Sequence, residues 1–375
     1  MGSVKTIGIV GGGQLGRMLT LAAKPLGFSV VVLDSSKDCP AAQVGADVVV
    51  GGLYDEAAIA RLAERSDVVT VEIEHLSTKA LAAVAAAGTP VHPAPQTVEL
   101  IQDKYRQKQA LVTANIPVAD SVDVETKDMA KKVLAEFGGS MILKAKHGAY
   151  DGRGNAVVKS AHELDSAWEA LGGKNLYAEK LVAFTKELSV IMARSTSGEV
   201  VLYDVVEMNH ERSICLEVIV PAQITETAKA TAQKIAQQVG GILEGAGVFA
   251  IEMFLLPDDS VLVNEIAPRV HNSGHHSIES AITSQFEQHI RAVAGLPLGK
   301  TDLKKPAVMV NVLGRKNGDV ELGVSEALGF ADTHLHWYGK SPVKVDRKMG
   351  HITAVHDNIE IARMNANAAR EALDV

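Results

Sequence analysis

Short apolar runs alternate with amphipathic segments through the N-terminal part of the chain. The apolar runs predict strands at 5–10, 29–34, 67–74 and 89–93, and the amphipathic segments predict helices at 14–27, 55–66 and 78–88. Strands that alternate with helices favour a doubly wound parallel sheet. We therefore expect an α/β domain over residues 1–102.

The pattern changes beyond Pro93. One helix or a pair of helices is predicted over 97–116, and strands at 141–146 and 156–160 flank a glycine-rich turn. Two further strands and one amphipathic helix are predicted at 248–256, 260–267 and 277–295. We place a small central α+β domain at 103–181 and a larger α+β domain at 182–375.

The composition is that of a globular protein, with 47% hydrophobic and 22% charged residues. The formal net charge of -8 offers no basic field for nucleic acid, so any phosphate site must be built locally. The 2 cysteines are too few for a disulfide framework and favour a reducing compartment. No apolar run approaches the roughly 20 residues of a membrane span, and the N-terminus lacks a signal-peptide pattern. We expect a cytoplasmic protein that binds neither nucleic acid nor membranes.

A glycine pattern follows the first predicted strand. Gly11, Gly13 and Gly16 fit G-x-G-x-x-G, and Asp34 ends the second strand. Such glycines let a pyrophosphate approach a helix N-terminus, and an acid after the second strand binds the adenosine ribose. An NAD-dependent dehydrogenase is therefore one hypothesis. A tight turn beside a capped strand end would leave the same pattern.

The glycine-rich turn of the predicted hairpin is surrounded by charged side chains. Tyr150, Asp151 and Arg153 lie in the turn, and Lys144 and Lys146 precede it. Bare glycine backbone can lie close to phosphate oxygens while nearby cations neutralise them. The alternative is an exposed hairpin tip with ordinary surface charges.

A pair of glutamates faces each other across the strands at 248–256 and 260–267. If Asp258 and Asp259 form a two-residue loop, Glu252 lies directly opposite Glu265. Neither strand offers a Lys or Arg on that face, so a divalent cation is expected between the carboxylates, and oxygen ligands favour Mg²⁺. Asn264 could supply a further ligand. A longer loop would shift the register and turn both glutamates toward water.

The loop after these strands carries Arg269, His271 and Asn272. An arginine and a histidine in one turn can grip an anion beside the metal. The neighbouring histidines could also suggest a transition-metal site, but their neighbours Arg and Asn are not typical metal ligands.

In this order, the features resemble the ATP-grasp ligases, and among them the 5-(carboxyamino)imidazole ribonucleotide synthases of purine biosynthesis. The matching segments span nearly the whole chain and are GGGQLGRM (11–18), PAAQVGAD (40–47), DVVTVEIEHL (67–76), AYDGRGN (149–155), YAEK (177–180), VFAIEMFLL (248–256), NEIAPRVHNSGH (264–275), GLPLG (295–299) and RKMGHIT (347–353). The chain departs from this family at His276 and Ser277, where an aromatic residue and threonine are usual.

The resemblance implies an ATP-grasp fold: a Rossmann-like N-terminal domain, a small central lid domain, and a larger C-terminal domain with the metal site and a terminal subdomain. It also implies a reaction. ATP would phosphorylate bicarbonate to carboxyphosphate, and the carboxyl group would pass to the amine of 5-aminoimidazole ribonucleotide, with ADP and phosphate as the other products.

The resemblance further implies roles for individual residues. ATP would be held by Lys104, Lys144, Glu179, Lys180, Val182, Glu187, His210 and Asn264. Mg²⁺, with Mn²⁺ as an alternative, would be held by Glu252 and Glu265. The reacting groups would be surrounded by Tyr150, Asp151, Arg153, Arg269, His271, Asn272 and Lys348. The ribonucleotide would be held by Gln14, Leu15, Glu72, Arg347 and Lys348.

Other functions remain as alternatives. Formate-dependent glycinamide ribonucleotide transformylase and biotin carboxylase would share the metal pair and differ in the acceptor. A dehydrogenase would leave the glutamate pair and the hairpin without a role. We also expect a homodimer, for which the apolar helix at 78–88 is a candidate interface, although it serves equally well as a core helix.

Overall fold

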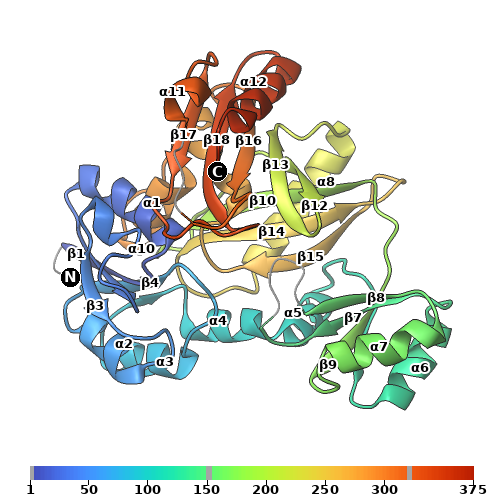
Figure 1. The fold of residues 1–375 in the computed structure, drawn as a ribbon. Helices are drawn as coiled ribbons and strands as arrows, with labels where there is room; N and C mark the ends of the chain where they lie inside the picture. Colours follow the sequence, from blue (N-terminus) through green and yellow to red (C-terminus); the bar gives the residue numbers. More distant parts are fainter. Residues whose placement is uncertain (1–3, 149–153, 319–322) are drawn as a thin grey trace.

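The computed structural model describes residues 4–148, 154–318 and 323–375. They form three sheets: a parallel sheet within residues 6–92, a small antiparallel sheet within 121–180, and a large antiparallel sheet within 186–355 (Figure 1). The domain boundaries drawn from the sequence, after residues 102 and 181, stay predictions. Within the described ranges, every helix is too short or too polar to cross a membrane.

The N-terminal sheet is parallel throughout, with strand order β3-β2-β1-β4-β5, as the alternating pattern predicts. Its elements are β1 (Thr6–Val10), α1 (Gln14–Ala23), η1 (Lys24–Leu26), β2 (Ser29–Asp34), η2 (Ala42–Val44), β3 (Asp47–Val50), α2 (Glu56–Ala63), β4 (Val68–Val71), α3 (Thr78–Ala86) and β5 (Val91–His92). The sequence analysis missed β3, whose four residues make a short edge strand.

Helices cover both faces of this sheet. Alternate strand residues point to opposite faces, so Val30 and Val32 pack in the core that includes α1, whereas Val31 and Leu33 pack against α2 and α3. The first of these cores also contains residues of the large sheet and of α10 (Gln285–Val293). The two parts therefore share buried apolar surface, which fixes the ends of the parallel strands relative to the large sheet.

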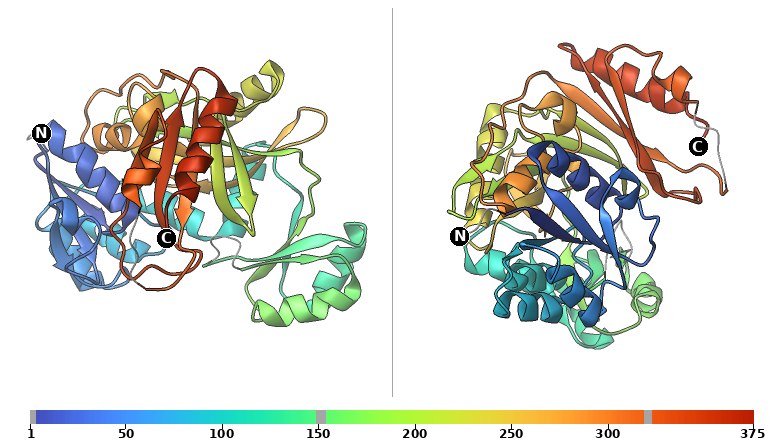
Figure 2. Two further views of the ribbon diagram at one scale, coloured as in Figure 1. Left: turned by 45° about the horizontal axis from the view of Figure 1, so that its top comes forward. Right: turned by 90° about the vertical axis from the view of Figure 1, so that its left-hand side faces the viewer.

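A helix pair leads into the small sheet, whose strand order is β6-β9-β7-β8. The elements are α4 (Pro95–Gln102), α5 (Lys104–Thr113), β6 (Ser121–Val124), α6 (Lys127–Glu136), β7 (Met141–Ala145), β8 (Asn155–Val158), α7 (Ala161–Ala170) and β9 (Leu176–Lys180). Asp103 separates α4 from α5 by capping the N–H groups of Tyr105 and Arg106. This part, with α6 and α7, protrudes from the rest of the molecule (Figures 1 and 2).

The large sheet has nine strands in the order β15-β14-β10-β12-β13-β16-β18-β17, with β11 paired to β10. The strands are β10 (Lys186–Arg194), β11 (Val200–Leu202), β12 (Val206–Glu211), β13 (Ile214–Val220), β14 (Gly247–Leu255), β15 (Val261–Ala267), β16 (Ala307–Leu313), β17 (Thr333–Trp337) and β18 (Lys348–Val355). The remaining helices are α8 (Glu226–Gly240), η3 (Asn272–Gly274), α9 (Ser277–Ser280), α10, α11 (Val324–Ala327) and α12 (Ile359–Glu371).

The single helix predicted over 277–295 is wrong. Ala281 adopts extended backbone after α9, and Ser284 begins α10 by accepting a hydrogen bond from the Glu287 N–H. An amphipathic pattern can continue across a break because only the buried face enters the pattern. The break places the first residue of α10, Gln285, beneath the loop that carries Arg269 and His271.

Candidate active site

Glu252 on β14 lies directly opposite Glu265 on β15, as predicted. The predicted two-residue loop is wrong, however. Hydrogen bonds join Leu256 to Ser260, so the loop contains 257–259, and Asp259 takes the left-handed conformation with φ 65°. A β-bulge between Glu252 and Met253 then shifts the register by one residue and restores the pairing.

Each glutamate of this pair has a basic side chain from outside the two strands as its partner. Nζ of Lys104, the first residue of α5, lies 2.9 Å from Glu265, and Nε2 of His271 lies 3.0 Å from Oε1 of Glu252. Burial raises the pKa of Glu252, but His271, His210 and Lys104 together outweigh it and hold the pKa at about 2. Glu252 is therefore an ionised, half-buried carboxylate.

The carboxylate pair fits a hard divalent cation. Two opposed carboxylates supply oxygen ligands, and Asn264 lies in the neighbouring bulge. Over the described parts of the chain, no group of three or more His, Cys, Asp or Glu side chains could hold a metal. A cation here would therefore take its other ligands from bound substrate or water, which is typical of Mg²⁺ in phosphate sites.

Arg269 connects this site to the end of strand β4. Its guanidinium bonds both oxygens of Glu74, at 2.6 and 3.0 Å. Burial raises the pKa of Glu74, but the Arg269 charge and hydrogen bonds outweigh it and bring the pKa to about 2. Glu74 is missing from the sequence-based site, because its partner is 195 residues away along the chain.

A further carboxylate, that of Glu179 on β9, lies between two lysines. Nζ of Lys144 on β7 lies 2.6 Å from Oε1 of Glu179, and Nζ of Lys108 lies 2.9 Å from Oε2. Lys108 is missing from the sequence-based site. Its spacing from Lys104 places both lysines on one face of α5, which is the signal that could have identified it. Both carboxylate oxygens of Glu179, a residue predicted to contact the nucleotide, therefore lie at ion-pair distance from lysines.

Glu187 on β10 and His210 on β12, both predicted to contact the nucleotide, lie side by side. His210 Nδ1 is 3.3 Å from Glu187 Oε1. Burial lowers the pKa of His210, but the adjacent Glu187 carboxylate and the Glu252 charge raise it above the ordinary histidine value. Asn272 lies in the turn η3, and among the described residues its buried side-chain oxygen and nitrogen have no hydrogen-bond partner.

The glycine-rich loop before α1 is packed around Glu72. A Cβ on Gly11, which has φ +113°, would overlap this side chain, and Cβ atoms on Gly13 and Gly16 would lie 2.9 Å and 3.2 Å from its oxygens. The carboxylate accepts hydrogen bonds from the N–H groups of Gly13 and Gly16. A carboxylate of the chain thus sits at the helix N-terminus, where a dinucleotide phosphate would bind.

The residues predicted around the glycine pattern have different surroundings in the structure. Gln14 and Leu15 begin α1 next to the Glu72-bound loop. In the dehydrogenase hypothesis, Asp34 would bind the ribose of a dinucleotide. In the structure, it accepts a hydrogen bond from the Ser36 N–H at the end of its strand. Burial raises the pKa of Glu72 despite its two backbone donors.

Two of the remaining predicted residues lie at the start of β18. Arg347 donates to the Pro342 carbonyl at 3.0 Å, and the Lys348 carbonyl accepts a hydrogen bond from Lys340. The charges at the site interact with one another between the end of β4, the start of α5 and the large sheet with the loop after β15, in a group that contains Glu72, Glu74, Lys104, His210, Glu252, Glu265, Arg269 and Lys348. Tyr150, Asp151 and Arg153 lie outside the described residues.

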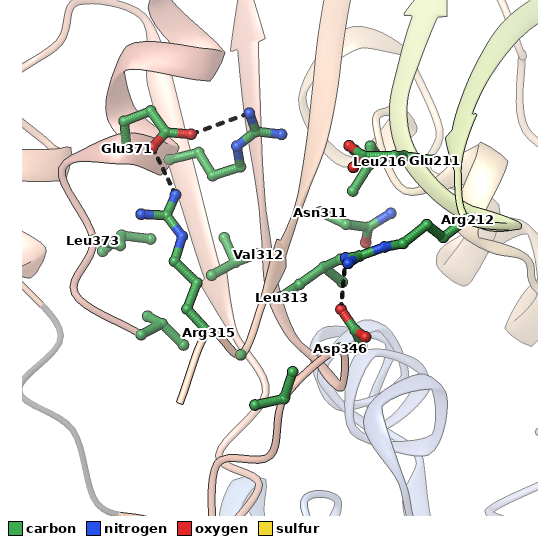
Figure 3. A pocket seen from close by; sticks show the side chains of 14 residues that line it. Glu211, Arg212, Leu216, Asn311, Val312, Leu313, Arg315, Asp346, Glu371 and Leu373 are labelled. Atoms are coloured by element: carbon green, nitrogen blue, oxygen red, sulfur yellow. Dashed lines mark hydrogen bonds and ion pairs between the residues drawn. The ribbon is translucent and has the colours of Figure 1, made fainter. Parts of the chain in front are cut away.

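A separate pocket of about 350 Å³ lies between the β12–β13 hairpin, β16 and the end of α12 (Figure 3). None of the predicted site residues lines it. Arg212 at one rim is 2.9 Å from Asp346, and Arg315 at the other is 2.8 Å from Glu371. Each of these two arginines therefore has a carboxylate partner within the lining of the pocket.

Family models match three consecutive parts of the chain. A ribonucleotide synthetase preATP-grasp domain matches residues 4–102, an ATP-grasp domain matches 109–286, and a phosphoribosylaminoimidazole carboxylase C-terminal domain matches 307–365. The predicted fold class, an ATP-grasp fold with a parallel N-terminal sheet, is therefore confirmed.

Individual proteins match over nearly the full chain. The N5-carboxyaminoimidazole ribonucleotide synthase of Bacillus subtilis is 42% identical over 92% of this chain and 90% of its own length. The phosphoribosylaminoimidazole carboxylase of Ogataea methanolica is 44% identical over 95% of this chain and 67% of its own length. The chain spans about two thirds of the length of this and other fungal and plant relatives.

A solved structure shows the same fold. The N5-carboxyaminoimidazole synthase of Aspergillus clavatus, in complex with ADP and 5-aminoimidazole ribonucleotide, superposes with a TM-score of 0.92 at 37% identity, covering 99% of both chains. The similarity extends through all three sheets, so it includes every element that supplies a residue to the site described above.

Proposed function

Because this chain belongs to the N5-carboxyaminoimidazole ribonucleotide synthase family of ATP-grasp enzymes, we propose that it is an ATP-dependent ligase that carboxylates 5-aminoimidazole ribonucleotide. A bicarbonate oxygen attacks the γ-phosphorus of ATP, which releases ADP and forms carboxyphosphate. The amine of the ribonucleotide then takes the carboxyl group, losing a proton, and phosphate leaves. The observation that carries this proposal is the opposed pair of Glu252 and Glu265, with Lys104 and His271 as their partners.

The proposed nucleotide site lies between the small and large sheets. Lys104 and Lys144 neutralise phosphate oxygens, since each already holds a carboxylate at an ion-pair distance and can exchange it for phosphate. Glu179, with the backbone of Lys180 and Val182, binds the adenine. Glu187 binds the ribose hydroxyls, with His210 beside it.

The proposed metal ligands are Glu252 and Glu265, with Asn264 as a further oxygen donor. When bound, Mg²⁺ or Mn²⁺ would supply positive charge that stabilises phosphoryl transfer. The residues present fit this ion because both carboxylates are directly opposed and Glu252 is ionised far below neutral pH.

The proposed acceptor site lies at the carboxyl ends of the N-terminal strands. Gln14, Leu15 and Glu72 hold the ribose or base, and Arg347 and Lys348 hold the ribonucleotide phosphate. Arg269, His271 and Asn272 orient bicarbonate against the amine, and Tyr150, Asp151 and Arg153 are predicted to take part as well. A site closed on several sides keeps short-lived carboxyphosphate from water.

The test is phosphate release from ATP, measured with bicarbonate and 5-aminoimidazole ribonucleotide and with each omitted in turn. We expect full activity only with all three. Formate with glycinamide ribonucleotide is the matched alternative pair, and faster release with that pair would assign the chain to the transformylase reaction instead. Saturable micromolar binding of NADH would favour the dehydrogenase hypothesis.

We further propose a homodimer in the cytoplasm. A reducing compartment such as the cytoplasm agrees with the 2 buried free cysteines. Sedimentation velocity at micromolar concentration would detect a dimer, and a single species of 39.7 kDa would contradict it.

A further inference from the structure

Gln285 holds the backbone of His271 on both sides. Its Oε1 accepts a hydrogen bond from the His271 N–H at 3.0 Å, and its Nε2 donates to the His271 carbonyl at 2.7 Å. The same Nε2 lies 3.0 Å from Nδ1 of His275. Gln285 is fully buried at the first position of α10, so water cannot replace these bonds.

The surrounding loop is built to admit this side chain. A Cβ on Gly274 would lie 2.5 Å from Oε1 of Gln285, so only glycine leaves room for the amide. Ser277 ties the loop to the same helix, because its hydroxyl donates to the Gly274 carbonyl and accepts from the Gln285 N–H. The break between α9 and α10 therefore serves to bring one amide under the loop.

The ring of His271 is also held at both nitrogens. Nε2 faces Glu252 at 3.0 Å, and Nδ1 is 2.9 Å from the Ser273 hydroxyl, which in turn is 2.8 Å from the Ser189 hydroxyl on β10. The backbone clamp and the hydroxyl pair together leave the ring one orientation, toward the carboxylate pair.

We propose that Gln285 is a positioning residue that fixes His271 against Glu252 in the active site. This role rests on the proposed function for its effect on catalysis, but not for its effect on the His271 ring. Gln285 touches no substrate or metal ligand and acts only through the loop. Small displacements of a positioned group are costly, since about 1 Å can lower a rate by about 100-fold.

The test compares Gln285→Met with Gln288→Met. Gln288 is the matched control, because it lies on the same helix, is equally buried, and clamps Gly299 through the same two kinds of hydrogen bond, at 2.8 Å each. Both variants should lose similar thermal stability. We expect kcat to fall about 100-fold in Gln285→Met alone, with the KM for ATP unchanged. Equal kcat losses in both variants would overturn the proposal.

A double mutant separates positioning from general loosening. If Gln285 acts through His271, Gln285→Met/His271→Ala should be no slower than His271→Ala. A double mutant that loses the product of the two single-mutant factors in kcat would contradict the proposal.

A spectroscopic measurement distinguishes this proposal from the proposed function. In ¹⁵N-histidine spectra, the His271 ring signal should shift in Gln285→Met and not in Gln288→Met. This result stands even if the wild type releases no bicarbonate-dependent phosphate, which would reject only the proposed function.

A milder variant guards against misfolding of Gln285→Met. Ser273→Ala removes only the hydroxyl that faces Nδ1 of His271, and should lower kcat and shift the same ring signal. Ser280→Ala is its control, since Ser280 bonds His276 in the same way at 2.7 Å, away from Glu252. An unshifted His271 signal in Ser273→Ala would overturn the hydroxyl part of the clamp.

Discussion

Two acidic sites in this protein neutralise their carboxylates in different ways. Glu72 accepts hydrogen bonds from the backbone N–H groups of Gly13 and Gly16. Glu252 and Glu265 face His271 and Lys104, which come from other elements. Backbone donors cannot leave without unwinding the start of α1, whereas the long side chain of Lys104 can move. The first site is therefore closed to an outside anion, and the second can exchange Lys104 for substrate and metal.

This difference explains why the glycine fingerprint is misleading. Gly11, Gly13 and Gly16 provide the close approach and the exposed N–H groups that a pyrophosphate needs. In this fold the same features accommodate the chain's own Glu72. The glycine pattern predicts that an anionic group lies at a helix N-terminus. It does not distinguish a bound ligand from a carboxylate side chain of the same chain.

The largest effect is expected at the exchangeable site. Glu265→Gln should lower Mg²⁺-dependent ATP turnover by about 100- to 1,000-fold, because a preorganised charge beside the phosphates is lost. Steady-state phosphate release across a Mg²⁺ titration measures this. Glu207→Gln is the control, since Glu207 pairs with Lys186 at 2.6 Å outside the predicted site. Undiminished turnover in Glu265→Gln would reject the metal role.

The next effect concerns Glu74, whose partner is a buried side chain. The pKa of Glu74 is about 2, below the ordinary value of 4.5, so the folded state favours its ionised form. The resulting stabilisation is fully present above about pH 5 and is lost as the pH falls toward 2. The difference in unfolding free energy between wild type and Glu74→Gln should shrink by about 3 kcal/mol over that range. Urea unfolding at a series of pH values measures it, with the exposed Glu64→Gln as control. A constant difference would contradict the ion pair.

Glu72 should show the opposite pH dependence, because its pKa is raised. The folded protein disfavours its ionised form, so its contribution is present below the ordinary glutamate pKa and declines as the pH rises above it. In mildly acidic buffer, Glu72→Gln should lower the unfolding free energy by about 2 kcal/mol, since one backbone donor loses its acceptor. Asp34→Asn, at the neighbouring strand end, should change it by less than about 0.5 kcal/mol. Equal losses of unfolding free energy in Glu72→Gln and Asp34→Asn would contradict a special role for the hydrogen bonds of Glu72.

The smallest effect is expected at the acceptor phosphate. Lys348→Ala should raise the KM for 5-aminoimidazole ribonucleotide about tenfold and leave the KM for ATP nearly unchanged, because one charge-assisted hydrogen bond is lost. Initial rates at varied ribonucleotide measure this. Lys344, exposed in the same loop, supplies the control variant Lys344→Ala. An unchanged ribonucleotide KM in Lys348→Ala would remove this residue from the acceptor site.

Much of the fold could be predicted from local patterns. The parallel N-terminal sheet, the helix pair and the pairing of Glu252 with Glu265 all follow from periodicity and counting. The same reasoning missed the short edge strand β3 and the break after α9. The glutamate pairing itself rested on two offsets that cancel, a longer loop and a bulge, which periodicity cannot distinguish from a regular hairpin.

The sequence by itself determined which residue types stand at the strand ends and which faces of the helices carry them, as with Lys104 and Lys108 one turn apart on α5. Only the tertiary structure decided which charge meets which: Arg269 with Glu74, Lys108 with Glu179, and the glycine loop with Glu72. The reason is physical. Periodicity is a local property of the chain, whereas the partner of a buried charge depends on which distant elements the packed cores bring together.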